Sequence, residues 1–93
     1  MNTRPAVERR NRGRIVDFRI RFDHEPEPAL LTIIENTLRR SDAVLSHEGK
    51  EVAIALSGTS VEEAIRVIAP RMRTLIERQR VHCSFLINGR AFS

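Results

Sequence analysis

Residues 15–22 alternate between apolar and charged side chains, and this pattern constrains the fold more than any other in the chain. The odd-numbered residues from 17 to 21 are charged. The even-numbered ones are all apolar: Val16, Phe18, Ile20 and Phe22. Successive side chains of a strand point to opposite faces, so a strand with this period has one face in the core and one in water. The segment therefore predicts a half-buried β-strand.

Two later segments predict helices. Apolar residues recur at helical spacing over 30–38, in a helix expected to end near 40–42, and again over 61–76. Ser60 begins a capping box with the glutamate three residues later, and the pair one position earlier offers the same spacing. Pro70 has no backbone N–H, so it should kink the second helix or split it in two.

Three further strands are predicted. Residues 43–46 and 52–56 should pair as a hairpin that turns at 47–50, where Gly49 is free to adopt a positive φ. The last strand covers 81–87, which is rich in apolar and β-branched residues. An Asn-Gly pair follows it and is expected to close it.

The resulting order of elements, βαββαβ over residues 15–93, predicts one α+β domain with the ferredoxin-like arrangement. Its sheet would hold four antiparallel strands, with both helices on one face. Right-handed crossovers would place the first strand beside the third, which leaves the second and fourth strands as edges. The end of the first strand, residues 21–23, would then lie next to the hairpin tip at 47–51.

The excess of basic charge lies in the first 14 residues. The chain of 93 residues has a net charge of +4, and residues 1–14 supply all of it, because the basic and acidic residues of the rest cancel. We expect 1–14 to be a disordered arm. It either binds nucleic acid or another anionic surface through residues 4–14, or serves as a solubilising tail. The chain has no Trp or Tyr to stack on RNA bases.

The composition predicts a cytoplasmic protein without a membrane partner. No apolar run approaches the roughly 20 residues that span a bilayer, and the N-terminal residues lack the apolar centre of a secretory signal. Cys83 is the single cysteine, so it cannot form an internal disulfide, and we expect it to be a packed core thiol. No metal-ligand spacing and no phosphate-binding glycine loop is present, so no cofactor is expected.

Residues 38–88 contain four short motifs in the order and spacing of a known family. They are Arg39-x-x-Asp42, the hairpin sequence Glu48-Gly49-Lys50-Glu51-Val52, the helix cap Gly58-Thr59-Ser60 and the helix start Glu62-Glu63-Ala64. The segment resembles the second part of GGDEF domains, the diguanylate cyclases that make cyclic dimeric GMP in bacterial signalling. The resemblance implies a shortened, degenerate member of the nucleotidyl cyclase and ferredoxin-like palm superfamily.

The resemblance also implies that catalysis is lost. Two acidic residues hold the metal in the family, and here Arg21 and Lys50 take their positions. These cations repel the magnesium that two-metal phosphoryl transfer requires. The segment that holds guanine in the family is missing, because His24 runs almost directly into the first helix. We therefore expect no enzyme activity, no catalytic residues and no metal.

The charges left at the hairpin tip have two interpretations. Arg21, Asp23, Lys50 and Glu51 should lie close together on the predicted topology. They form either a surface salt-bridge cluster in place of the metal site or an anion site that uses Arg21 and Lys50.

Arg39, Arg40 and Asp42 are the candidate ligand-binding residues. In the family, an Arg-x-x-Asp just before the signature binds the product, cyclic dimeric GMP, and here the Arg stands at the same offset from the signature. An Arg can donate two hydrogen bonds to a guanine edge or a phosphate, and an Asp accepts from guanine nitrogens. The alternative is structural: the arginines complement the C-terminus of the helix and Asp42 shapes the turn.

Three classes of function stay open. The first is a non-catalytic regulatory module that binds cyclic dimeric GMP through the Arg39-x-x-Asp42 site. The second is a protein-interaction or dimerisation domain without a nucleotide ligand, which pairs through an edge of its sheet. The third is nucleic-acid binding through the basic arm.

Overall fold

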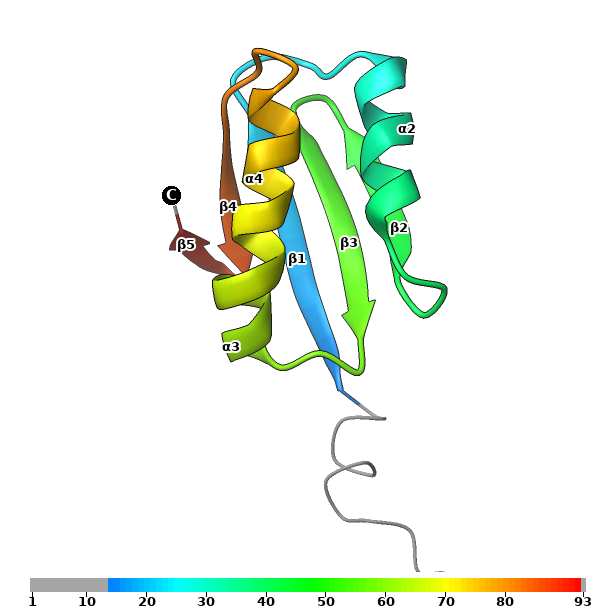
Figure 1. Cartoon of the computed structure of the whole chain (residues 1–93), viewed down its shortest axis with the longest axis vertical. Helices are drawn as coiled ribbons and strands as arrows, with labels where there is room; N and C mark the ends of the chain where they lie inside the picture. The colour runs from blue at the N-terminus through cyan, green and yellow to red at the C-terminus, as the bar shows by residue number, and fades with distance from the viewer. Residues whose placement is uncertain (1–13, 93) are drawn as a thin grey trace, which may run out of the picture.

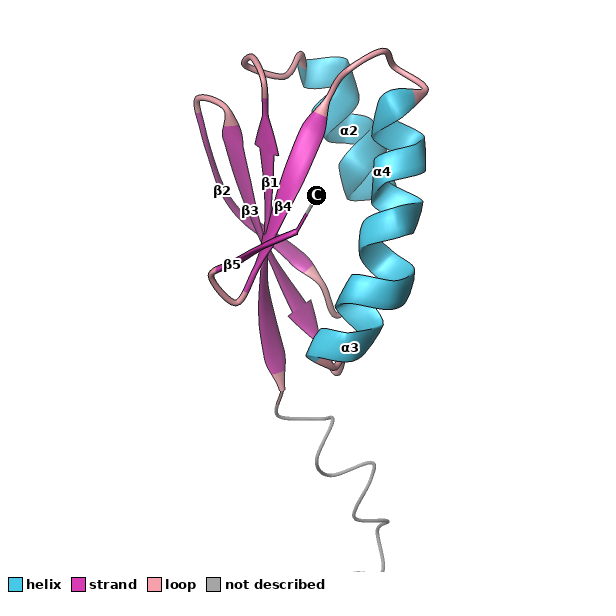
Figure 2. Cartoon of the chain, turned by 90° about the vertical axis from the view of Figure 1, so that its left-hand side faces the viewer, coloured by secondary structure: helices cyan, strands magenta, loops and turns pink. Residues whose placement is uncertain are grey.

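The computed structural model of the chain describes residues 14–92 and has two layers, an antiparallel sheet of five strands and helices that cover one of its faces (Figures 1 and 2). The elements in chain order are β1 (Ile15–Phe22), α2 (Pro28–Thr37), β2 (Ala43–Glu48), β3 (Glu51–Ser57), α3 (Val61–Glu63), the π-helical turn η1 (Ala64–Ile68), α4 (Ala69–Glu77), β4 (Cys83–Ile87) and β5 (Arg90–Phe92). The strand order in the sheet is β2-β3-β1-β4-β5. The predicted α+β class is confirmed.

β1 is the central strand and pairs antiparallel with β3 on one side and β4 on the other. Its even-numbered side chains point toward the helices and are buried, as the alternation predicts. Phe18 and Ile20 are fully buried, and the Phe18 ring lies 5.3 Å from the ring of Phe85 in β4. The core therefore forms between this face of the sheet and the helices.

The hairpin of β2 and β3 turns more tightly than expected. Its strands extend to Glu48 and from Glu51, so Gly49 and Lys50 alone make the turn, where the sequence predicts four residues. Gly49 has a φ of +58°, which confirms its predicted role. The pairing of β2 with β3 shifts register between Val44 and Ser46.

The prediction of four strands is wrong, because the Asn-Gly pair turns the chain instead of ending it. Asn88 and Gly89 have φ values of 51° and 83°, which is the geometry of a two-residue type I′ hairpin turn. Asn88 Oδ1 accepts from Asp17 N at 2.9 Å, and Asn88 N donates to the Asp17 carbonyl at 2.8 Å. The turn leads into β5, so β4 is an inner strand and the edges of the described sheet are β2 and β5.

The first helix, α2, ends at Thr37, a few residues before the predicted end. The Thr37 hydroxyl donates to the carbonyl of Ile34 at 2.7 Å, and the N–H of Leu38 donates to the carbonyl of Glu35 at 3.1 Å. Leu38 itself is extended, with a ψ of 149°, so the chain leaves the helix there.

The second helix begins at the predicted cap and contains an irregular turn before Pro70. Ser60 Oγ accepts from Glu63 N at 3.0 Å. Because Pro70 has no N–H and its ring crowds the carbonyl four residues earlier, an α-helical turn is disfavoured here. The chain forms the wider turn η1 instead, in which the N–H of Ala69 donates to the carbonyl of Ala64. Across residues 14–92, no helix combines the length and apolarity needed to cross a bilayer.

Candidate functional site

Arg39 and Asp42, two of the predicted ligand residues, lie in the turn between α2 and β2 and bind each other. Asp42 Oδ2 accepts from the Arg39 backbone N at 2.9 Å and from Arg39 Nε at 3.3 Å. Asp42 Oδ1 accepts from the backbone N of Ser57, at the end of β3, at 3.2 Å. Both Asp42 oxygens therefore accept hydrogen bonds from within the fold, and the side chain is only 4% exposed.

The Arg39 guanidinium extends this network to the loop after β3. Its Nη2 donates to the carbonyl of Ser57 at 3.2 Å and to the hydroxyl of Thr59, which is fully buried. The Arg39 side chain is half exposed. Arg40 is exposed and makes no side-chain hydrogen bond or ion pair within residues 14–92. The structure thus joins Arg39 to Asp42 and leaves Arg40 outside their network.

These contacts give Arg39 and Asp42 a structural task. They hold the α2–β2 turn against the end of β3, and the N–H of Asp42 adds a turn hydrogen bond to the Arg39 carbonyl at 2.9 Å. A ligand that used the same nitrogen and oxygen atoms would have to replace these internal bonds, which costs the free energy of leaving them unpaired.

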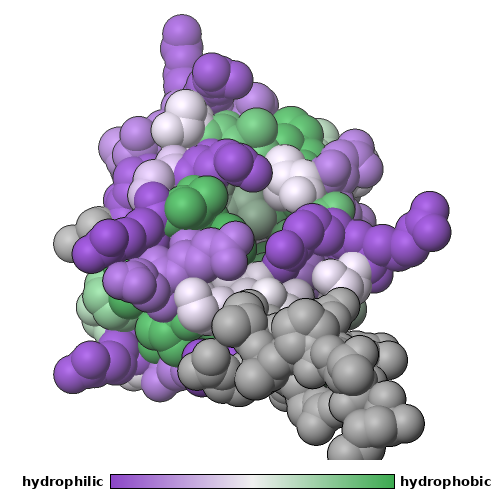
Figure 3. All heavy atoms as spheres, turned by 60° about the horizontal axis from the view of Figure 1, so that its bottom comes forward, coloured by the Kyte–Doolittle hydropathy of each residue, from purple (hydrophilic) through white to green (hydrophobic). Residues whose placement is uncertain are grey.

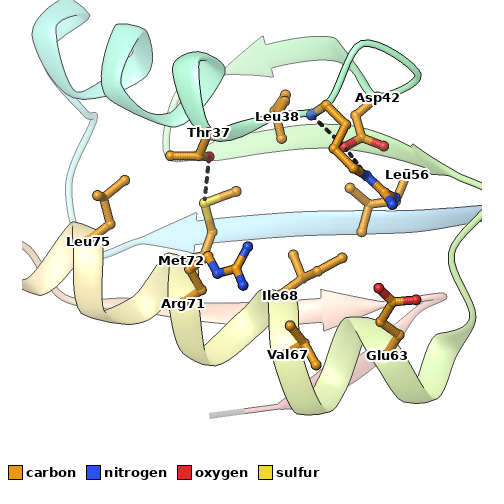
Figure 4. A pocket seen from close by; sticks show the side chains of 11 residues that line it. Thr37, Leu38, Asp42, Leu56, Glu63, Val67, Ile68, Arg71, Met72 and Leu75 are labelled. Carbon is orange, nitrogen blue, oxygen red and sulfur yellow. Dashed lines mark hydrogen bonds and ion pairs between the residues drawn. The ribbon is translucent and has the colours of Figure 1, made fainter.

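A groove beside this network separates the C-terminal half of α2 from the second helix, and we call it the α2–α4 groove (Figure 4). Its cavity has a volume of about 160 Å³. Its lining consists of Thr37, Leu38, Arg39, Asp42, Leu56, Glu63, Val67, Ile68, Arg71, Met72 and Leu75. Leu56 and Met72 form a buried apolar floor, and Thr37 Oγ1 approaches Met72 Sδ at 3.7 Å.

The mouth of the groove is also apolar. Val67 is 43% exposed, which is unusual among the large apolar residues of the described chain. Leu38, Ile68 and Leu75 are partly exposed beside it. On the end of the molecule that carries α3, apolar side chains reach the surface between hydrophilic ones (Figure 3).

The sequence pattern does not predict this groove. The apolar stripe that predicts the core face of the second helix consists of Val61, Ala64, Ile65, Ile68, Met72, Leu75 and Ile76, and Val67 lies outside it. The available signal was the spacing of Glu63, Val67 and Arg71, which follow one another at intervals of four residues and place an apolar residue between two charges.

The second predicted site, at the hairpin tip, is a cluster of ion pairs. The end of β1 lies next to the tip as predicted, with Arg21 opposite Glu51. Glu51 Oε1 accepts from Arg21 Nη2 at 3.1 Å and from Arg21 Nε at 3.3 Å, while Oε2 accepts from Arg19 Nη1 at 3.1 Å. Lys50 lines the same shallow hollow as Arg21 and Glu51, whereas Asp23 pairs with His24 at 2.7 Å.

These contacts shift the pKa of the groups involved. Hydrogen bonds from Arg21 first, and then from Arg19, lower the pKa of Glu51. The hydrogen bonds that Arg19 donates to Asp17 and Glu51 raise the pKa of its guanidinium. Glu51 is therefore a counter-ion for both arginines, and an anion at this tip would compete with it.

Cys83 is half buried at the start of β4. Burial raises the pKa of its thiol, which disfavours the reactive thiolate. The basic arm predicted to bind nucleic acid lies, apart from Arg14, outside the described residues.

Comparison with family models, with curated proteins and with solved structures finds no match to this chain.

We predict that Asp42→Ala lowers the free energy of unfolding by about 1–3 kcal/mol, because it leaves the N–H groups of Arg39 and Ser57 without their acceptor. Urea unfolding followed by circular dichroism measures the change. Arg40→Ala removes a charged residue from the same turn and should change the value by less than about 0.5 kcal/mol. Equal effects of the two substitutions would show that the Asp42 network does not stabilise the turn.

We predict that Arg21→Gln raises the pKa of Glu51 toward its ordinary value of 4.5, because the hydrogen bond from Arg21 contributes most to lowering this pKa. Carboxyl carbon chemical shifts followed by NMR over pH 2–7 measure this pKa. A folded-state pKa below the unfolded one stabilises the protein above pH 4.5, and this stabilisation is lost as the pH falls through the folded-state value. An unchanged Glu51 titration in the variant would contradict the assignment of Arg21 as its main partner.

Proposed function

We propose that this chain is a non-catalytic protein-interaction domain and that the α2–α4 groove is its contact surface. The observation that carries the proposal is the combination of a buried apolar floor with an exposed apolar mouth at Val67. Apolar surface that is rimmed by polar residues is typical of sites that bind other proteins or ligands.

The size of the cavity supports a side chain as the bound group. An apolar cavity of about 150 Å³ is large enough to hold benzene, so one of about 160 Å³ suits one apolar side chain of a partner. Pockets for small ligands are usually larger, at about 300–1,000 Å³. The groove therefore fits an anchor residue better than a whole cofactor.

The proposal agrees with the residues at the family's metal positions. Arg21 and Lys50 are cations that line one hollow, where a GGDEF-type cyclase needs carboxylates. The order β2-β3-β1-β4, with the helices on one face, supports a ferredoxin-like core to which β5 is added. Together these features support a scaffold of GGDEF-like descent that binds rather than catalyses.

The test is a selection of displayed random peptides on the immobilised full chain. We expect the selected peptides to share an apolar anchor and to lose their affinity for a Val67→Asp variant, which places a charge at the mouth of the groove. Leu45→Asp is the matched control, because Leu45 is 64% exposed on β2, and it should leave binding unchanged. Peptides that bind the Val67→Asp variant as well as the original chain, or a selection that enriches none, would reject the groove as the contact surface.

A second candidate function is a receptor for cyclic dimeric GMP. The observation that favours it is that Arg39 and Asp42 both line the α2–α4 groove, with Arg40 exposed beside them. An apolar floor next to an arginine suits a purine ring and its phosphate.

For this candidate we predict micromolar binding in a calorimetric titration of the chain with cyclic dimeric GMP. Arg39→Ala and Arg40→Ala should each weaken the binding at least about tenfold if they lose a charge-assisted hydrogen bond of about 1.5–3 kcal/mol. Circular dichroism must show that both variants are folded, and Leu45→Asp serves again as the control. The absence of heat at millimolar ligand would exclude the receptor and leave the protein-interaction domain.

A further inference from the structure

We propose that the partner in the α2–α4 groove is a second copy of this chain, related by a two-fold axis that passes close to Val67. The inference rests on the proposed function, because it takes the groove to be a contact surface and names its occupant. The reason is that the charges on this face of the second helix are complementary to themselves.

Three residues of the second helix line the groove in a row. Glu63, Val67 and Arg71 all line the groove, so the exposed Val67 has a carboxylate on its N-terminal side and a guanidinium on its C-terminal side (Figure 4). Glu63 and Arg71 are both exposed, and neither has an ion-pair partner among residues 14–92. The neighbouring Glu62 and Arg66, in contrast, pair with each other at 3.7 Å.

A two-fold axis at Val67 matches these charges in pairs. When two copies of the helix lie antiparallel, Glu63 of each copy faces Arg71 of the other, and the two Val67 side chains meet at the centre. A two-fold interface requires such self-complementarity, because the same surface of each copy faces the other. Where one residue of the first copy contacts a second residue of its partner, the reverse contact also forms. A parallel arrangement would bring like charges together and is disfavoured.

The same arrangement covers the apolar mouth of the groove. Leu38, Ile68 and Leu75 are partly exposed around Val67. A second copy laid antiparallel across this mouth would cover them, so the contact has an apolar centre at Val67 and a charged rim, as stable interfaces do.

The β2 edge is a weaker candidate for self-association. Its register shift between Val44 and Ser46 interrupts the row of hydrogen-bonding groups that a second β2 would need. Such bulges are among the features by which proteins protect an edge strand from pairing. Pairing through β2 is therefore the alternative that the experiment must distinguish.

The test is a charge exchange followed by sedimentation velocity of the full chain over a range of concentrations. We expect the unchanged chain to dimerise, and Glu63→Arg and Arg71→Glu each to weaken the dimer at least about tenfold, because each places like charges opposite each other twice. An equimolar mixture of the two variants should form heterodimers, and the double variant Glu63→Arg/Arg71→Glu should recover the homodimer. Glu62→Arg, the same charge change off the groove, should leave the dimer unchanged.

Three results would overturn the proposal. The first is an unchanged chain that stays monomeric at millimolar concentration, which leaves the groove itself to be judged by the peptide selection. The second is a mixture of Glu63→Arg and Arg71→Glu that does not pair. The third is a dimer that survives both substitutions and is lost in Leu45→Asp, which would assign the contact to the β2 edge.

Discussion

The structure depends on the burial of one face of β1. This strand lies in the middle of the sheet, supplies hydrogen bonds to both β3 and β4, and places four apolar side chains under the helices. A shift of one residue in its pairing would turn this apolar face to water and bring charged residues into the core, so the register is strongly determined. The positions of the hairpin tip, the helices and the groove all follow from that register.

The Asp42 network shows how a few polar groups fix the geometry around this core. Asp42 and Arg39 connect the end of α2 to the end of β3. Without these bonds, the two segments would be linked only by the pairing of β2 with β3. The groove lies directly beside this connection, so its width depends on polar contacts on one side and on the packing of Met72 on the other. In this domain, the residues that resemble a ligand site also hold the wall of the groove.

The sequence predicted the elements whose signals are local. The alternation in β1, the positive φ of Gly49 and the Ser60 cap each depend on a few neighbouring residues, and all three are present. β5 was missed because the Asn-Gly pair precedes only three residues of strand, too few to show a period. The groove was missed because it depends on contacts between distant residues, such as Asp42 with Ser57, which no local pattern records.

The π-turn η1 has a consequence for how the surface of this domain can change. A π-turn holds one residue more than an α-helical turn, and each residue of a helix is rotated by about 100° from the last. The turn therefore sets the angular phase of α3 relative to α4. Loss or gain of a single residue in this turn would rotate Glu63 away from the groove and Ala64 out of the core, while Met72 and Ile76 kept their places. The part of the helix before Pro70 is therefore tied to the core through Ala64, and its outward face cannot turn without disturbing that packing.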